Sequence, residues 1–481
     1  MLFNSFEFLI FLPITFLLYW FVFKTRHIQN IFIVIASYVF YGWWDWRFLL
    51  LIAFTTLCSY FSGILLERQE GKRNIQKLIS ASNIALNLTI LCIFKYYNFF
   101  GENLRELLLL FGWEVDWVTL DILLPVGISF YTFQALSYTI DVYQHKIKAT
   151  HDIIAFFAFI SFFPQLVAGP IERATQLLPQ FLKCRSFNAT KATDGMRQIL
   201  WGLFKKIVVA DNCSLIVNAT FNSYPEKDGF QLLLGAIFFT FQIYGDFSGY
   251  SDIAIGTARL FGINLMRNFN NPYFSRSIAE FWRRWHISLT TWFRDYIYIP
   301  LGGSRVCRWK VLRNTLIIFL VSGFWHGANW TFICWGAFHA LLFFPLLLLN
   351  RNKKYTDVVA SGRLLPNLKE IYQMLCTFFL VVIGWIIFRA ESISQAWDYV
   401  YCMITKFTLQ FNMPIYGYKT SAFILLMLFT EWITRQRTHG LDIKPKSIFR
   451  YRIVRWIIYY GIVLIILQWG GKQEDFIYFQ F

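Results

Sequence analysis

The chain has 481 residues, of which 57% are hydrophobic, 20% are aromatic and only 15% are charged. Soluble domains carry about 25% charged residues, so this composition excludes an ordinary water-soluble protein and predicts a membrane protein. The net charge of +17 would suggest nucleic-acid binding in a soluble protein. Basic residues also concentrate in the cytoplasmic loops of membrane proteins, however, and we expect no nucleic-acid partner.

Apolar runs predict membrane spans and re-entrant segments, in chain order at 8–23, 31–44, 48–66, 78–94, 118–143, 152–170, 207–221, 230–262, 281–299, 314–325, 330–349, 371–388, 422–433 and 456–469. Basic loops alternate with acidic or neutral ones, which predicts extracytoplasmic N- and C-termini. The segments 152–170 and 281–299 have basic residues on both sides, so we expect each to enter and leave on one face. Irregular backbone at membrane depth needs a protein or water-filled shield, so these segments predict a cavity. The fold class is all-α, a polytopic membrane protein of about 11–13 helical spans.

The run 230–262 contains GDFSGYSD, in which Asp246 and Asp252 would be costly to expose to lipid. We therefore expect both carboxylates to face the protein interior, where they brace the structure rather than react.

Two apolar runs flanked by basic loops, 314–325 and 330–349, predict a helical hairpin with His326 at its turn. Twelve helical residues rise about 18 Å, so His326 would lie past the midplane of a hydrocarbon core about 30 Å thick. Burial favours the neutral imidazole, which suits a general base. The alternative is a buried histidine satisfied by a neighbouring carbonyl group.

The segment EFWRRWHISLTTWFRDYIYIPLGG supplies further candidates. His286 is a candidate catalytic residue near the cytoplasmic face, or else an interfacial residue. Arg283 and Arg284 are candidates for neutralising the phosphates of a cofactor, or else contact lipid headgroups. His339, on the return helix of the hairpin, is expected to be structural.

Tryptophans next to these residues belong more often to a core or an interfacial belt than to a binding site. Trp282 and Trp325 are nevertheless included as candidate cofactor-binding residues, together with Asn329. A tryptophan N–H group or the Asn329 amide is also a candidate oxyanion donor.

Other kinds of site have little support in the sequence. The eight cysteines form no CxxC pair, which predicts neither a disulfide framework nor a zinc site, and no metal ion is expected. A Walker motif, GxGxxG and GxSxG are missing, so nucleotide hydrolysis and lipase chemistry are unsupported. The final FIYFQF is too apolar for a free extracytoplasmic end, so we expect the tail 470–481 to fold back into the protein.

Four stretches resemble the membrane-bound O-acyltransferase (MBOAT) family: FYTFQALSYTIDVY, FFPQLVAGPIER, DFSGYSDIAIG and SGFWHGANWTFICWGAFHA. The similarity spans nearly the whole chain and is closest to the bacterial branch that contains the alginate O-acetyltransferase membrane subunit. It implies one domain over 1–481, with a catalytic core at about 118–349 and a ring of tilted helices around a central tunnel. It also implies a multi-pass protein of the bacterial inner membrane.

The same resemblance implies a reaction and its participants. Acetyl-CoA would enter from the cytoplasm, His326 would match the family's catalytic histidine, and His286 would match its second position. FIYFQF is similar to a motif in which a tyrosine is proposed to carry the acyl group, and that position here is Tyr478. Relatives pass the group to an extracytoplasmic SGNH-type partner, which modifies a polysaccharide such as alginate or peptidoglycan.

Three alternatives stay open at this point. The broken segments and basic loops also fit a transporter of polysaccharide or lipid-linked sugar. A non-catalytic scaffold of an export complex is a second possibility. Within the enzyme hypothesis, a D-alanyl-loaded carrier protein is the rival donor to acetyl-CoA.

Overall fold

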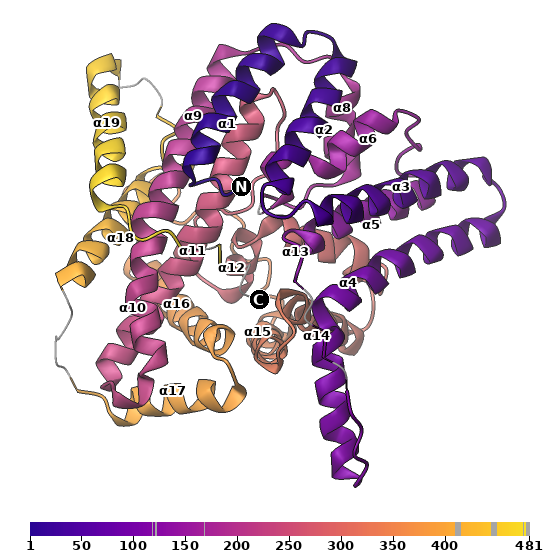
Figure 1. The fold of residues 1–481 in the computed structure, drawn as a ribbon. Coiled ribbons are helices and arrows are strands. Elements are labelled where there is room, and N and C mark those ends of the chain that lie inside the picture. Colours follow the sequence, from indigo (N-terminus) through magenta and orange to yellow (C-terminus); the bar gives the residue numbers. More distant parts are fainter. Residues whose placement is uncertain are drawn as a thin grey trace. The chain divides into compact units, whose positions relative to one another are not determined.

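The structure is a computed structural model that describes residues 1–481 except 118, 121–122, 168, 409–414, 444–449, 475 and 478–481. Its described residues form helices and connecting segments, and no strand occurs among them (Figure 1). This confirms the predicted all-α class. The chain folds into two compact units, and each is described by itself below.

Unit 1 comprises residues 1–192 and 257–266. Its helices are α1 (Phe6–Leu17), η1 (Leu18–Val22), α2 (Arg26–Gly42), α3 (Arg47–Arg68), α4 (Arg73–Leu110), α5 (Ile128–Tyr143), α6 (Ile153–Ser161), α7 (Phe163–Leu166) and α8 (Ala174–Leu182). Helix α5 is the centre of this unit, because α3 and α4 both pack against it and nearly all of its residues are buried. The helix that contains the predicted span 78–94 is much longer than expected: α4 continues past residue 94, includes Glu102 and Glu106, and ends at Leu110.

Unit 2 comprises residues 193–256 and 267–481. After α9 (Ala189–Leu203), whose first residues belong to unit 1, its helices are η2 (Phe204–Ala210), α10 (Asp211–Asn222), η3 (Tyr224–Glu226), α11 (Gly229–Leu260), whose last residues belong to unit 1, η4 (Pro272–Phe274), α12 (Ile278–Arg284), α13 (Ile287–Phe293), η5 (Arg294–Tyr298), α14 (Arg308–His326), α15 (Trp330–Leu348), α16 (Leu368–Arg389), α17 (Ile393–Thr405), α18 (Ile415–Ile433) and α19 (Arg452–Trp469). The sequence did not predict α17. This helix has only 13 residues, and polar residues interrupt its apolar ones, so its sequence contains no apolar run that would predict a span.

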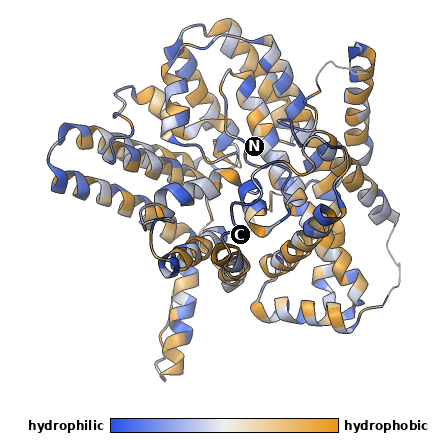
Figure 2. Ribbon diagram, turned by 180° about the vertical axis from the view of Figure 1, so that it is seen from behind, coloured by the Kyte–Doolittle hydropathy of each residue, from blue (hydrophilic) through white to orange (hydrophobic). Residues whose placement is uncertain are grey.

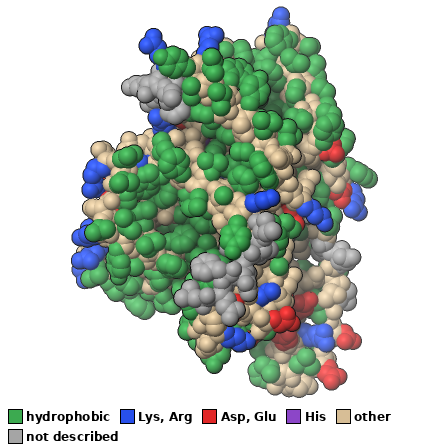
Figure 3. Space-filling view, turned by 90° about the vertical axis from the view of Figure 1, so that its left-hand side faces the viewer, with side chains coloured by type: hydrophobic (Ala, Val, Ile, Leu, Met, Phe, Trp, Pro, Cys, Tyr) green, Lys and Arg blue, Asp and Glu red, His purple; other side chains and the backbone are tan. Residues whose placement is uncertain are grey.

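Six described helices are long and apolar enough to cross a membrane: α3, α4, α11, α15, α16 and α19. Hydrophobic residues recur along the helices in Figure 2, and hydrophobic side chains predominate on the face shown in Figure 3. The polytopic membrane class is therefore confirmed. The central tunnel and the single catalytic domain stay predictions.

Helices α14 and α15 form the predicted hairpin, and they pack closely through two glycines. A Cβ atom on Gly323 would lie 2.2 Å from the backbone oxygen of Phe332, and one on Gly336 would lie 2.3 Å from that of Phe319. Each glycine thus admits the backbone of the opposite helix, as small residues do at contacts between membrane helices. Helix α14 of this closely packed hairpin ends at His326.

The predicted segment 281–299 is broken into α12, α13 and η5. The break lies at His286, whose φ of 43° places it in the left-handed region. Such backbone is uncommon for residues other than glycine and often occurs at functional sites. The left-handed residue separates α12 from α13. His286 is only 1% exposed.

Candidate functional site

A pocket in unit 2 brings the two candidate histidines together. Its cavity volume is about 50 Å³, and its lining comes from α12, α13, α14 and the residues between α12 and α13. The lining residues are Trp282, Trp285, His286, Leu289, Thr290, Phe293, Ile318, Phe319, Ser322 and His326. We call this the two-histidine pocket. Apart from the imidazoles, its lining is dominated by aromatic and aliphatic side chains, so a reacting group in it would contact mainly apolar surface.

His326 is the last residue of α14 and is 3% exposed. Its ring makes edge contacts with Trp335 at 5.2 Å and with Phe388 at 5.4 Å between centroids. Trp335 comes from α15 and Phe388 from α16. Three helices therefore fix the orientation of one imidazole, which is what a positioned acid or base requires.

The tautomer of His286 follows from its hydrogen bonds. The backbone N–H of Ser288 donates to Asn268 Oδ1 at 3.3 Å, which identifies that atom as the amide oxygen. His286 Nδ1 lies 3.1 Å from the same oxygen and must carry a proton to donate to it. The neutral imidazole therefore keeps its lone pair on Nε2, a buried atom that has no hydrogen-bond partner among the described residues.

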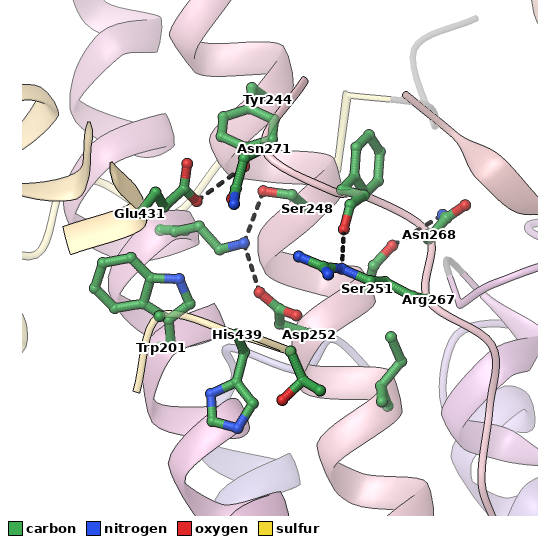
Figure 4. A pocket seen from close by; sticks show the side chains of 15 residues that line it. Trp201, Tyr244, Ser248, Ser251, Asp252, Arg267, Asn268, Asn271, Glu431 and His439 are labelled. Atoms are coloured by element: carbon green, nitrogen blue, oxygen red, sulfur yellow. Dashed lines mark hydrogen bonds and ion pairs between the residues drawn. The ribbon is translucent and has the colours of Figure 1, made fainter. Parts of the chain in front are cut away.

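Asn268 also connects His286 to a second, polar pocket, which Figure 4 shows from close by. Its Nδ2 donates to Ser251 Oγ at 3.1 Å, on α11. Across this polar pocket, Lys205 Nζ contacts Asp252 Oδ2 at 2.5 Å and donates to Ser248 Oγ at 2.9 Å (Figure 4). Asp252 thus faces the interior in an ion pair, as the sequence predicted. The orientation of His286 therefore depends on the α11 motif DFSGYSD.

The two tryptophans singled out by sequence both lie at the two-histidine pocket. Trp282 lines it, and the Trp325 ring lies 5.9 Å from that of His286. Trp282 is 8% exposed, and its Nε1–H group has no acceptor among the described residues. A buried donor of this kind is available to a ligand that brings an oxygen atom.

Arg283 and Arg284 hold the loop that follows α15. Arg284 is buried, and its Nη2 lies 2.8 Å from Glu280 Oε1 and donates to the backbone oxygen of Asp357 in this loop at 2.9 Å. Exposed Arg283 donates to the backbone oxygens of Asn352 and Tyr355, at 2.6 and 2.5 Å. Both guanidinium groups thus have partners within the protein.

Arg276 continues this network to Asp357, at 3.0 Å. Partial burial tends to raise the pKa of Asp357, but the Arg276 guanidinium outweighs it and holds that pKa below its ordinary value. The carboxylate therefore stays ionised at neutral pH and helps to fix the loop.

Asn329 has a structural role in the hairpin turn. Its Oδ1 accepts from the backbone N–H of Thr331 at 3.0 Å, which caps the N-terminus of α15. Its Nδ2 donates to the backbone oxygen of Glu391 at 3.0 Å.

His339 is fully buried against Trp282 and Trp335, and does not line the pocket. Tyr478 lies outside the described residues.

Two further residues, Asn268 and Lys206, were not predicted from the sequence. Asn268 lies in MRNFNNP, where asparagines are typical of turns, so only the fold shows that it contacts His286. Lys206 lies in FKKIVVAD, at the edge of a predicted span. Lys205 and Lys206 precede Asp211 by six and five residues. This spacing was the sequence signal for a buried ion pair between a lysine and Asp211.

The chain is similar to a known protein family and to several known proteins. The sequence model of the membrane-bound O-acyltransferase family matches residues 146–383, which include both histidines. The probable alginate O-acetylase AlgI of Pseudomonas aeruginosa is 42% identical over 413 residues, 86% of this chain and 76% of the relative. A protein of the same name from Azotobacter vinelandii is 40% identical over 82% of this chain and 77% of its own length. The peptidoglycan O-acetyltransferase of Helicobacter pylori is 30% identical over 98% of this chain and 95% of its own length.

Proposed function

The chain belongs to the membrane-bound O-acyltransferase family, and from this premise we propose which acyl group it transfers and where. It is a multi-pass membrane acyltransferase. We propose that it takes an acetyl group from cytoplasmic acetyl-CoA and delivers it across the bacterial inner membrane to an extracytoplasmic polysaccharide. The observation that carries the proposal is the two-histidine pocket, where two buried imidazoles line one apolar cavity. The names of the relatives, an alginate O-acetylase and a peptidoglycan O-acetyltransferase, support an acetyl group and a polysaccharide acceptor.

In the proposed reaction His326 is the general base. It removes the proton from an attacking hydroxyl, whose oxygen forms a bond to the thioester carbonyl carbon. The carbon–sulfur bond then breaks, and the electron pair leaves with the CoA sulfur. A thiol has a pKa of about 8.5, so the thiolate needs little help to leave, and the proton on His326 can return to it. The neutral form of His286 offers a second lone pair, on Nε2, to the same pocket.

The charged residues suggest where the donor lies. Arg283 is exposed and holds its loop only through backbone carbonyls, so it is the better candidate for the donor phosphates. Arg284 is paired with Glu280, and it also donates to the backbone oxygen of Asp357 in the loop at 2.9 Å. Trp325 and Trp282 would then lie beside the acetyl group as it enters the two-histidine pocket.

Trp282 is the proposed oxyanion donor, because its buried Nε1–H lacks an acceptor among the described residues and its side chain lines the pocket. The Trp282→Phe variant keeps an aromatic ring and loses this donor. We expect kcat to fall about 10²–10³-fold, with little change in the KM for acetyl-CoA, measured as CoA release. Trp385→Phe is the matched control, since Trp385 is equally buried with an unpartnered N–H among the described residues but does not line the pocket. A wild-type kcat for Trp282→Phe would remove Trp282 from the reaction.

Tyr478 is the proposed first acceptor of the acetyl group, from which an SGNH-type extracytoplasmic partner would take it. The Tyr478→Phe variant lacks the hydroxyl and should show no acetyl label on the C-terminal peptide after incubation with acetyl-CoA. Tyr460→Phe, in exposed α19, serves as the control. Peptide mass spectrometry checks the result, and full transfer by Tyr478→Phe would exclude the covalent step.

One assay separates the enzyme from its alternatives. Purified protein in nanodiscs is given acetyl-CoA labelled in the acetyl group, and free CoA and labelled products are measured. The proposal predicts CoA release together with label on the protein or on an added polysaccharide acceptor. A transporter or a scaffold would release no CoA. Activity with a D-alanyl-loaded carrier protein and none with acetyl-CoA would keep the acyltransferase and replace the donor.

A further inference from the structure

A second group of buried charges in unit 2 lies outside the two-histidine pocket. Lys206 comes from η2, Asp211 from α10 and Asp246 from α11, and each is at most 3% exposed. Lys206 Nζ lies 2.8 Å from Asp211 Oδ1 and 2.8 Å from Asp246 Oδ1. One cation thus faces two carboxylates, and buried charges are costly unless all of their hydrogen bonds are made.

The C-terminal tail makes two of these hydrogen bonds with its backbone. The Glu474 carbonyl accepts from Lys206 Nζ at 2.9 Å. The Ile477 N–H donates to Asp246 Oδ2 at 2.7 Å. The tail therefore supplies one acceptor to the cation and one donor to a carboxylate, at positions three residues apart. Charge-assisted bonds of this kind are among the stronger hydrogen bonds in proteins.

The side chain between these two contacts is also bound. Phe476 is fully buried, with its ring 4.5 Å from that of Tyr250 and 5.7 Å from that of Phe247. Phe247 in turn lies 4.6 Å from the ring of His286. The ring of Phe247 therefore lies between Phe476 of the tail and His286 of the two-histidine pocket.

We propose that Lys206, Asp211 and Asp246, with Phe247 and Tyr250, form a binding site for the chain's own C-terminal peptide. The ligand class is a peptide with an aromatic residue, recognised through one carbonyl, one N–H group and one ring. We call this site the tail seat. Its contacts hold Glu474, Phe476 and Ile477, and Tyr478 follows them directly in the sequence. A role of the tail seat in acyl transfer rests on the proposed function of Tyr478, whereas binding of the tail does not.

The neighbouring lysine provides a matched control. Lys205 is also buried, but its ammonium group bonds to Asp252 and Ser248 of α11 rather than to the tail. Full-length Lys206→Met and Lys205→Met proteins in nanodiscs are treated with a carboxypeptidase, and intact mass follows how far trimming proceeds. The tail seat predicts that trimming of the wild type and Lys205→Met stalls before Ile477. In Lys206→Met, trimming past Ile477 should be faster by about tenfold or more, the change expected for loss of a hydrogen bond to a charged group.

A second variant covers the case in which Lys206→Met fails to fold. Phe476→Ala changes only the tail and leaves every membrane helix intact, and it should also be trimmed past Ile477. Trimming of Phe476→Ala at the wild-type rate would overturn the tail seat. Because the assay contains no acyl donor, its outcome is independent of Tyr478. A protected tail in an inactive Tyr478→Phe protein supports both proposals, and a protected tail in a fully active one supports the tail seat alone.

Discussion

Replacement of His326 by glutamine is expected to lower acyl transfer by about 10²–10⁴-fold, the contribution of a positioned general base. Glutamine keeps much of the side-chain size and polarity but cannot accept the proton. The ring contacts of His326 with α15 and α16 hold it for this purpose. The measurement is CoA release from acetyl-CoA by protein that elutes as a single folded species.

His339→Gln is the matched control, because His339 is equally buried on the same hairpin yet does not line the two-histidine pocket. It should retain most of the activity. Equal losses in both variants would mean that the hairpin tolerates neither change, and normal activity in His326→Gln would remove His326 from the mechanism.

Replacement of Gly323 by valine should destabilise the protein and abolish activity together. The new Cβ would lie 2.2 Å from the Phe332 carbonyl oxygen, so α14 and α15 would have to move apart. Overpacking costs about 1–3 kcal/mol when side chains can adjust, and here the obstacle is backbone. We expect a midpoint of thermal unfolding several degrees below that of the wild type, measured in detergent.

Gly461→Val is the control for this prediction. A Cβ on Gly461, in α19, meets no atom within 4 Å. The same valine should therefore leave the unfolding midpoint and the activity close to wild type. If both variants unfold at the wild-type temperature, close packing of the hairpin does not support the position of His326.

The hairpin and its histidine could be predicted from the sequence because the information is local. Basic residues flank two apolar runs, and His326 lies at the junction, so charge and length alone indicate a turn there. The observed helices differ from the predicted runs only at their ends. Helix α14, for example, begins at Arg308 rather than at residue 314. The interior position of Asp246 and Asp252 was predictable for a similar reason, since carboxylates within an apolar run must avoid lipid.

The partners of these residues could not be predicted, because they come from distant parts of the chain. The contact between Asn268 and His286 requires left-handed backbone at a histidine, which no local pattern indicates. Lys206 meets Asp246 and the carbonyl of Glu474 only after η2, α11 and the tail have come together. The assignment of Arg284 and Asn329 to the cofactor stays a prediction. The structure adds that Arg284 forms an ion pair and that Asn329 caps a helix.

An experimental structure with a non-hydrolysable thioether analogue of acetyl-CoA would test the central claim most directly. We predict that the analogue's acyl carbon lies in the two-histidine pocket, within hydrogen-bonding reach of His326 through an attacking oxygen, with its oxygen directed to Trp282 Nε1. An analogue bound elsewhere, with this pocket closed and filled by protein side chains, would contradict the assignment of the reaction to His326 and His286.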